Sequence, residues 1–333
     1  MKRRGALCTF GSLAILLWSG ASAGQSATKV HRIGTLHSHV PSEEAIWRAT
    51  FAPFIAQLRT LGWVEGRNLI IEHRSGDGDS ARMRQGARDL VRLSVELIVT
   101  TGTGPTIAAK EATSSIAIVS TGSDPVAMGV VKSLNDPGRN VTGFYTNSLE
   151  LVRKRLELTR ELLPNLDRIA LIHEEAYVPR KETFMEYERL CESFGVQLVL
   201  TGVTTTTEIE PAVAKAVEHR VQAIMAQSEG FWTDERVDTL VGAAKRRRLP
   251  VIVASKYWTQ RGALLGLEGD PDGEESTRAT AYFVDKILRG ARPADLPIQQ
   301  ATRFALSINA KTAKEIGLTI PPSLVARADH VYR

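Results

Sequence analysis

Short apolar runs alternate with amphipathic stretches along most of the chain. Residues 32–36 form the first apolar run, and from 47 to 61 apolar residues recur at helical spacing until Gly62 ends the pattern. Residues 68–73 are the next apolar run, and 80–93 the next helical stretch. This alternation predicts βαβ units and parallel sheets, whose strands are rich in Val and Ile because helices cover both sheet faces.

The alternation falls into two halves of similar length and one plan. We therefore predict an α/β protein with two Rossmann-like lobes, each built on a parallel sheet. Residues 30–145 would form the N-terminal lobe and 146–261 the C-terminal lobe. The remainder is predicted to cross back, with about 262–290 joining the first lobe and about 295–333 the second. Repeated crossings of this kind make a multi-crossover hinge.

The first 23 residues have the layout of a secretory signal peptide. Lys2, Arg3 and Arg4 precede an apolar run over 7–18, and small residues follow up to Ala23. The run is shorter than the roughly 20 apolar residues of a membrane-spanning helix. The chain is therefore expected to be exported to the periplasm and cleaved near Ala23, and Cys8, which stands before most of the apolar run, is not placed for lipid attachment.

Composition and charge point to an ordinary globular protein without a nucleic-acid partner. The chain is 43% hydrophobic and 24% charged. Loss of the three leader cations lowers the formal net charge from +5 to +2. The only tight basic run, 245–248, lacks interleaved aromatic residues and ends a predicted helix, where cations suit the helix dipole.

The sequence shows no arrangement typical of catalysis or metal binding. Beyond residue 23 it contains no G-x-S-x-G elbow, no phosphate-binding G-x-x-x-x-G-K-[ST] and no H-E-x-x-H. Cys191, the one cysteine outside the leader, is expected to be a small buried hydrophobe. His37, Ser38 and His39 are neighbours, but a nucleophile and base also need an orienting partner. We expect no enzyme, no cofactor and no metal.

Candidate ligand-binding residues lie where the predicted strands end, because ligands of doubly wound sheets bind beyond the carboxyl ends of the strands. These segments are rich in hydroxyls, glycines and backbone donors at helix N-termini, which suit a carboxylate. The predicted contacts are Ser38, Thr101, Gly102, Thr103, Ser123, Asp124, Thr142, Tyr145, Glu175, Ser228, Tyr257 and Trp258.

Three of these segments have a second interpretation. Residues 101–105 resemble the start of a dinucleotide fingerprint but lack its third glycine. They therefore either bind a polar group of the ligand or form a purely structural turn. Asp124 precedes a proline, which also favours a turn. Tyr257 and Trp258 either stack on an apolar or aromatic ligand or pack against the hinge.

Several stretches resemble motifs of one protein family. Residues 61–69, LGWVEGRNL, resemble LGYVEGRNV, and 133–143, SLNDPGRNVTG, resemble SLARPGGNVTG. The shorter matches, in chain order, are SDPV at 123–126, KRLEL at 154–158, ILRGARPADLP at 287–297, INAKTA at 308–313 and IGLTIP at 316–321. The matches follow one order over nearly the whole chain, and together they resemble a family of ABC transporter substrate-binding proteins that includes tryptophan/tyrosine-type uptake proteins.

The resemblance implies the periplasmic-binding type I fold and capture of a small solute, with an amino acid or an aromatic or carboxylate compound as the expected class. It also implies a monomer that delivers its solute to a membrane permease. Two segments depart from the family pattern, 262–269 and 173–176. The solute bound by this protein can therefore differ from the solutes of other family members. A sensory module that presents its ligand to a membrane receptor would share these features, and an exported α/β enzyme is a further alternative.

Overall fold

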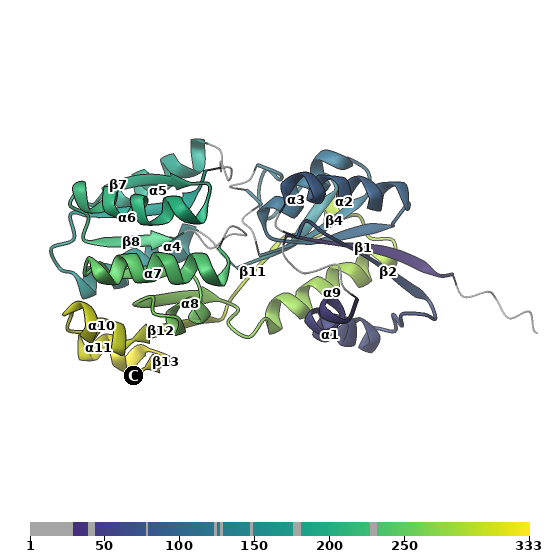
Figure 1. Ribbon diagram of the computed structural model, residues 1–333. Helices are drawn as coiled ribbons and strands as arrows, with labels where there is room; N and C mark the ends of the chain where they lie inside the picture. The colour runs from purple at the N-terminus through teal and green to yellow at the C-terminus, as the bar shows by residue number, and fades with distance from the viewer. Residues whose placement is uncertain are drawn as a thin grey trace, which may run out of the picture.

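The computed structural model describes residues 29–38, 44–77, 79–122, 125–126, 129–146, 149–175, 181–226 and 232–333. They form two lobes that lie side by side and are joined where the chain crosses between them (Figure 1). Each lobe is a sheet with helices on both faces. The predicted α/β fold with two Rossmann-like lobes is therefore confirmed.

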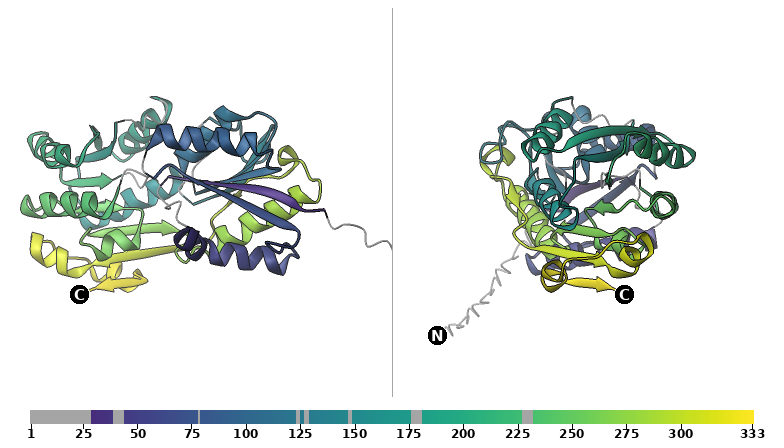
Figure 2. Two further views of the ribbon diagram at one scale, coloured as in Figure 1. Left: turned by 45° about the vertical axis from the view of Figure 1, so that its right-hand side comes forward. Right: turned by 90° about the vertical axis from the view of Figure 1, so that its left-hand side faces the viewer.

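The first lobe contains a six-stranded sheet in the order β11-β5-β4-β3-β1-β2, and every neighbouring pair is parallel. Its strands are β1 (His31–His37), β2 (Leu69–Ser75), β3 (Leu97–Thr101), β4 (Ala117–Gly122), β5 (Val141–Tyr145) and β11 (Gln299–Gln300). Helices α1 (Glu44–Thr60) and α9 (Glu274–Leu288) cover one face, and α2 (Ser80–Arg92) and α3 (Thr103–Ala112) the other. Figure 2 shows these two layers from other sides.

The second lobe contains a seven-stranded sheet in the order β13-β12-β10-β9-β8-β6-β7. Its strands are β6 (Arg168–Glu174), β7 (Gln197–Val203), β8 (Ala223–Ala226), β9 (Val251–Val253), β10 (Leu265–Gly269), β12 (Phe304–Asn309) and β13 (His330–Tyr332). The helices are α4 (Leu149–Leu162), α5 (Lys181–Ser193), α6 (Thr206–Glu218), α7 (Asp234–Arg246), α8 (Lys256–Gln260), α10 (Ala310–Ile316) and α11 (Pro322–Arg327).

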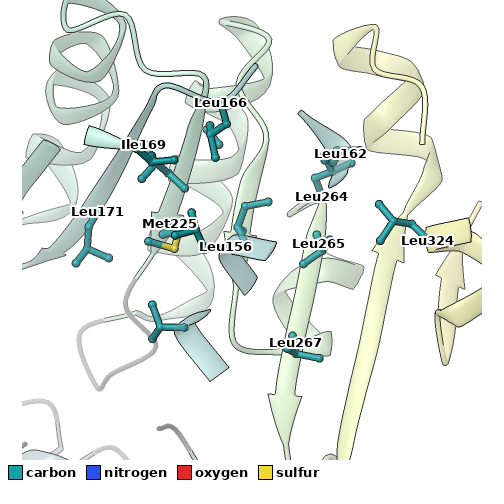
Figure 3. Packing of buried hydrophobic residues seen from close by; sticks show 14 of the residues in the cluster. Leu156, Leu162, Leu166, Ile169, Leu171, Met225, Leu264, Leu265, Leu267 and Leu324 are labelled. Carbon is teal, nitrogen blue, oxygen red and sulfur yellow. The ribbon is translucent and has the colours of Figure 1, made fainter. Parts of the chain in front are cut away.

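Leucine and isoleucine side chains fill the core between the second sheet and the α4, α5 and α11 side of the lobe (Figure 3). Leu156 of α4 and Ile169 of β6 are fully buried, and Leu265 of β10 is 1% exposed. Burial of each such side chain contributes about 1.5–3 kcal/mol. α6 and α7 bury a separate cluster on the opposite face, so each sheet stands between two apolar layers.

The tail of the chain divides between the lobes differently from the prediction. β10 lies in the second sheet, parallel to β9, whereas the sequence pattern predicts 262–269 in the first lobe. α9 does pack on the first sheet, and β11 pairs with β5 there, so the segment up to 301 stays with the first lobe. The chain then re-enters the second sheet from its carboxyl edge, which makes β12 antiparallel to β10.

The first family-like stretch, 61–69, has a structural role. Asn68 closes the turn after α1, because its side chain accepts from Val64 N at 2.7 Å and donates to Gly62 O at 3.0 Å. Trp63 donates from Nε1 to the buried carboxylate of Asp285 on α9, at 2.9 Å. The 61–69 stretch thus fastens α1 to α9.

A second family-like stretch, 154–158, holds the second lobe together. Arg155 of α4 is 7% exposed, and its Nε donates to Leu267 O of β10 at 3.0 Å. Burial lowers the pKa of this guanidinium to about 10, so it stays charged at neutral pH. A buried cation needs such partners, and it fixes α4 against β10.

Candidate functional site

The carboxyl edges of both sheets face the junction between the lobes. The chain crosses from the end of β5 to α4, from the end of β10 to α9 and from the end of β11 to β12. β5 is parallel to the other strands of the first sheet, and β10 is parallel to β9, β8, β6 and β7. The strand ends that carry the predicted contacts therefore flank the three crossings.

Hydrogen bonds tie two of the three crossing segments together. Asp270 N donates to Arg303 O at 2.9 Å. The Asp270 carboxylate accepts from the backbone N–H groups of Glu275 and Ser276, at 2.9 and 2.8 Å, and so caps α9. Glu275 accepts in turn from Thr302 N at 2.9 Å. The second and third crossings thus form one braced unit anchored to the first lobe.

In the first lobe, the ends of β1 and β3 bring Ser38 beside the first turn of α3. A Cβ placed on Gly104 would lie 3.9 Å from Ser38 Oγ and 2.9 Å from the Met83 methyl carbon. Gly102 caps α3 with a φ of 89°, which favours glycine, and its N–H donates to Thr121 O at 2.9 Å. Thr101 is exposed and Thr103 buried. A helix N-terminus flanked by a hydroxyl suits a carboxylate.

Buried hydroxyls hold these strand ends in register. Thr106 Oγ1 lies 2.8 Å from Thr100 Oγ1 and 2.9 Å from Ser120 Oγ, and it donates to Gly102 O at 2.8 Å. Thr100 and Thr106 are fully buried. The network connects β3, β4 and α3, so the position of the α3 N-terminus is fixed by the sheet.

Beside Ser38, the β1–β2 edge carries a buried cluster of aromatic rings. His37 is 2% exposed, and its ring lies 4.3 Å from the Phe51 ring and 5.5 Å from the His73 ring. The Trp47 ring stacks on His73 at 5.0 Å. Burial, with a smaller effect from His73, lowers the pKa of His37 to about 3. His37 is therefore neutral at physiological pH.

The depressed pKa of His37 predicts a loss of stability in acid. The His37 ring takes up a proton near pH 6.5 in the unfolded chain, and only near pH 3 in the folded chain. As the pH falls through that window, the free energy of unfolding therefore decreases by about 1.4 kcal/mol per pH unit. In urea unfolding at several pH values, H37L should therefore lose less free energy of unfolding than the parent as pH falls from 6.5 to 4. Equal slopes for the two proteins would rule out this role for His37.

In the second lobe, two tryptophans meet at the carboxyl ends of β8 and β9. The rings of Trp232 and Trp258 lie 5.7 Å apart at an interplanar angle of 63°. Both are half-buried against the α6–α7 side of the lobe. Tyr257 is 46% exposed, and its hydroxyl donates to Asp234 at 2.8 Å. The pair presents apolar aromatic surface next to the junction.

Acidic side chains stand at the end of β6. Glu174 is half-buried, and its burial raises the pKa of that carboxyl, against the effect of Arg236. Glu175 follows directly, is exposed, and donates its backbone N–H to Val203 O at 2.8 Å. This edge of the second lobe therefore offers carboxyl groups where the first lobe offers a helix N-terminus.

The remaining predicted contacts are placed as follows. Thr142 is fully buried, and its hydroxyl donates to Leu296 O at 2.8 Å, so we assign it a structural role between β5 and the 293–297 segment. Tyr145 is 5% exposed, and its carbonyl accepts from Ala301 N at the hinge. Ser123, Asp124 and Ser228 lie outside the described residues. Trp232 lies four residues beyond Ser228 and is not among the contacts predicted from the sequence.

Other reactive groups have structural partners or are shielded. Burial, with Glu188 and Glu192 nearby, raises the pKa of the Cys191 thiol to about 12. In the basic run at the end of α7, Lys245 pairs with Glu315, and Arg246 pairs with Glu210. Among the described residues, no group of His, Cys, Asp or Glu is arranged to hold a metal ion. Over the same residues, no helix is long and apolar enough to cross a membrane.

The family model described as "ABC transporter substrate binding protein" matches residues 43–332. The chain belongs to this family. It is a family of solute-binding proteins and not an enzyme family, so this substrate-binding protein matches the resemblance seen in its sequence motifs. Among curated relatives, the tyrosine-binding protein of Clostridioides difficile is 25% identical over 268 residues, which cover 80% of this chain and 75% of the relative.

Solved structures share the fold of this substrate-binding protein. A conserved domain protein from Vibrio cholerae is 27% identical with a TM-score of 0.78, covering 91% of this chain and all of that one. A domain from Streptococcus pneumonia in complex with L-Trp is 24% identical with a TM-score of 0.77, covering 91% and 100%. A ligand-free, open substrate-binding protein from Clostridium difficile is also 24% identical, with a TM-score of 0.64 and coverage of 91% and 99%.

Proposed function

We propose that this protein captures an aromatic amino acid between its lobes and delivers it to the permease of an ABC importer. The observation that carries the proposal is the Trp232–Trp258 pair, because an apolar aromatic surface at a strand edge suits an aromatic side chain. The α3 N-terminus with Ser38 would hold the carboxylate. The 25% identical tyrosine-binding relative supports the same ligand class.

Ligand capture would proceed by closure of the two lobes about the three crossings. A ligand that contacts both strand edges favours the closed form by its differential affinity for that form. The chain matches the L-Trp complex with a higher TM-score than the ligand-free open structure, at equal identity and equal coverage of this chain. Two hinge angles of one fold would produce this difference, with the present structure nearer the angle of the L-Trp complex.

Export would place the site outside the inner membrane. Residues 1–23 have the composition of a signal peptide, and we propose that the cleaved protein works as a periplasmic monomer. A solute-binding protein free in that compartment meets its permease by diffusion, with no nucleic acid involved.

A thermal-shift panel tests the proposed ligand class. Purified protein is heated with L-tryptophan, L-tyrosine, L-phenylalanine, L-leucine, ribose or adenosine. A ligand at 100 times its Kd stabilises the folded state by about 2.7 kcal/mol, so the aromatic amino acids should raise the melting temperature by several degrees. Stabilisation by ribose or adenosine alone would contradict the proposal, and so would turnover of any of the six compounds.

A further inference from the structure

Glu175 occupies the same topological place in the second lobe as Ser38 in the first. The first lobe has the order β2-β1-β3-β4-β5 and the second β7-β6-β8-β9-β10. Ser38 follows β1 directly and Glu175 follows β6 directly. Both strands lie between the second and third strands of their lobe, and both end at the junction. Glu175 is thus placed to contact the ligand from the lobe opposite the α3 N-terminus.

Gly202 of β7 makes room for the Glu175 carboxylate. Gly202 pairs in register with His173 of β6. A Cβ on Gly202 would lie 1.5 Å from Glu175 Oε2 and 3.2 Å from His173 Cε1. The carboxylate therefore fills the space that any other side chain at 202 would occupy. Gly202 has no positive φ, so the glycine is required here for space and not for its backbone freedom.

The seated carboxylate has no cationic partner in the described part of the chain. Hydrogen bonds and ion pairs to the Glu175 side chain are absent there, and its one described bond is made by its backbone N–H. Arg236 acts on Glu174 instead. A carboxylate that is held against a strand end and has no counter-ion among the described residues is suited to accept a charged donor from a ligand, and charge-assisted hydrogen bonds of this kind are the strong ones.

We propose that Gly202 positions the Glu175 carboxylate to accept the α-ammonium group of the bound amino acid. The inference rests on the proposed function. It adds the protein group that recognises the α-ammonium, which an amino acid has and a simple aromatic carboxylic acid lacks. The carboxylate of the ligand would lie at the α3 N-terminus, the ring at Trp232 and Trp258, and the ammonium at Glu175. The ligand would then be held through three separate contacts.

Calorimetric titration with matched ligands tests the assignment. L-tryptophan is compared with indole-3-propionate, which keeps the ring and the carboxylate but lacks the ammonium. In both G202A and E175Q, the Kd for L-tryptophan should rise about 10- to 100-fold, the range of one charge-assisted hydrogen bond. The Kd for indole-3-propionate should stay within about twofold of the parent value.

The control is G195A, a glycine of the same lobe with no atom within 4 Å of its Cβ position, which should bind both compounds like the parent. G202A displaces the end of the flexible Glu175 side chain and also approaches the His173 ring. E175Q keeps the shape of the residue and tests the assignment should G202A fold poorly. Parent-like affinity of both variants for L-tryptophan would overturn the assignment and leave the proposed function standing. Failure of the parent protein to bind any aromatic amino acid would overturn both.

Discussion

Substitution of Gly143 by alanine is expected to destabilise the first lobe by about 4 kcal/mol or more, which is exceptional for a single substitution. Gly143 of β5 pairs with Ser120 of β4 and has a φ of 149°. A Cβ there would lie 1.9 Å from Ser120 O and 2.8 Å from the backbone N of the same residue. Neither neighbour is a flexible side-chain end, so the β4–β5 pairing itself would have to move.

Thermal unfolding with a matched glycine variant measures this effect. Gly195 also has a positive φ, 67°, but nothing lies within 4 Å of its Cβ position. G195A should cost about 1 kcal/mol, and G143A should lower the melting temperature several times further or yield no folded protein. A folded G143A whose melting temperature equals that of G195A would show that the close approach of β4 and β5 does not exist.

Loss of either ring of the tryptophan pair is expected to weaken binding of L-tryptophan by about 2–3 kcal/mol, or about 30- to 150-fold in Kd. The rings of Trp232 and Trp258 lie 5.7 Å apart at the carboxyl edge of the second sheet. Truncation to alanine removes apolar area and the edge-to-face geometry that favours a third ring. The W232A and W258A variants are compared with the parent by calorimetry.

Tyr282 offers the control for this comparison. It is an aromatic residue of α9 in the first lobe, 41% exposed, and Y282A should bind L-tryptophan with parent-like affinity. If W232A and W258A remain folded and also bind like the parent, the pair does not contact the ligand.

Most of the fold could be predicted from periodicity alone. The alternation of apolar runs and helical stretches predicts β1 to β9. Apart from the edge strands β2 and β7, these strands are mostly buried, and apart from β4 and β5, consecutive strands are separated by helices long enough to show a period. The tail was harder. β10 follows β9 after only the five-residue α8, and nothing local distinguishes a strand that adds to the same sheet from one that crosses to the other lobe.

The candidate site was predictable to the extent that it depends on strand ends. The topology brought Ser38 beside Gly102 and Thr103, since β1 and β3 are neighbours. Thr142 shows where prediction from strand ends fails, because its hydroxyl donates a hydrogen bond to the carbonyl of Leu296, 154 residues away in the sequence. Long-range pairing of this kind leaves no local signal.

The sequence contains a weak indication of the role of Gly202. A glycine inside a strand pattern often marks a close approach by another group, and here that group is Glu175. The family-like motifs pointed elsewhere: Trp63 and Arg155 hold helices in place. The most recognisable stretches maintain the scaffold, and the residues that contact the ligand are expected among less conspicuous positions.

Small-angle X-ray scattering with and without an aromatic amino acid tests the central claim, that the ligand is captured between the lobes, most directly. Purified protein is measured alone and with saturating L-tryptophan or L-tyrosine. The account predicts a smaller radius of gyration in the presence of either ligand, because a ligand held by both strand edges favours the closed form. Superimposable scattering curves with and without both amino acids would contradict it.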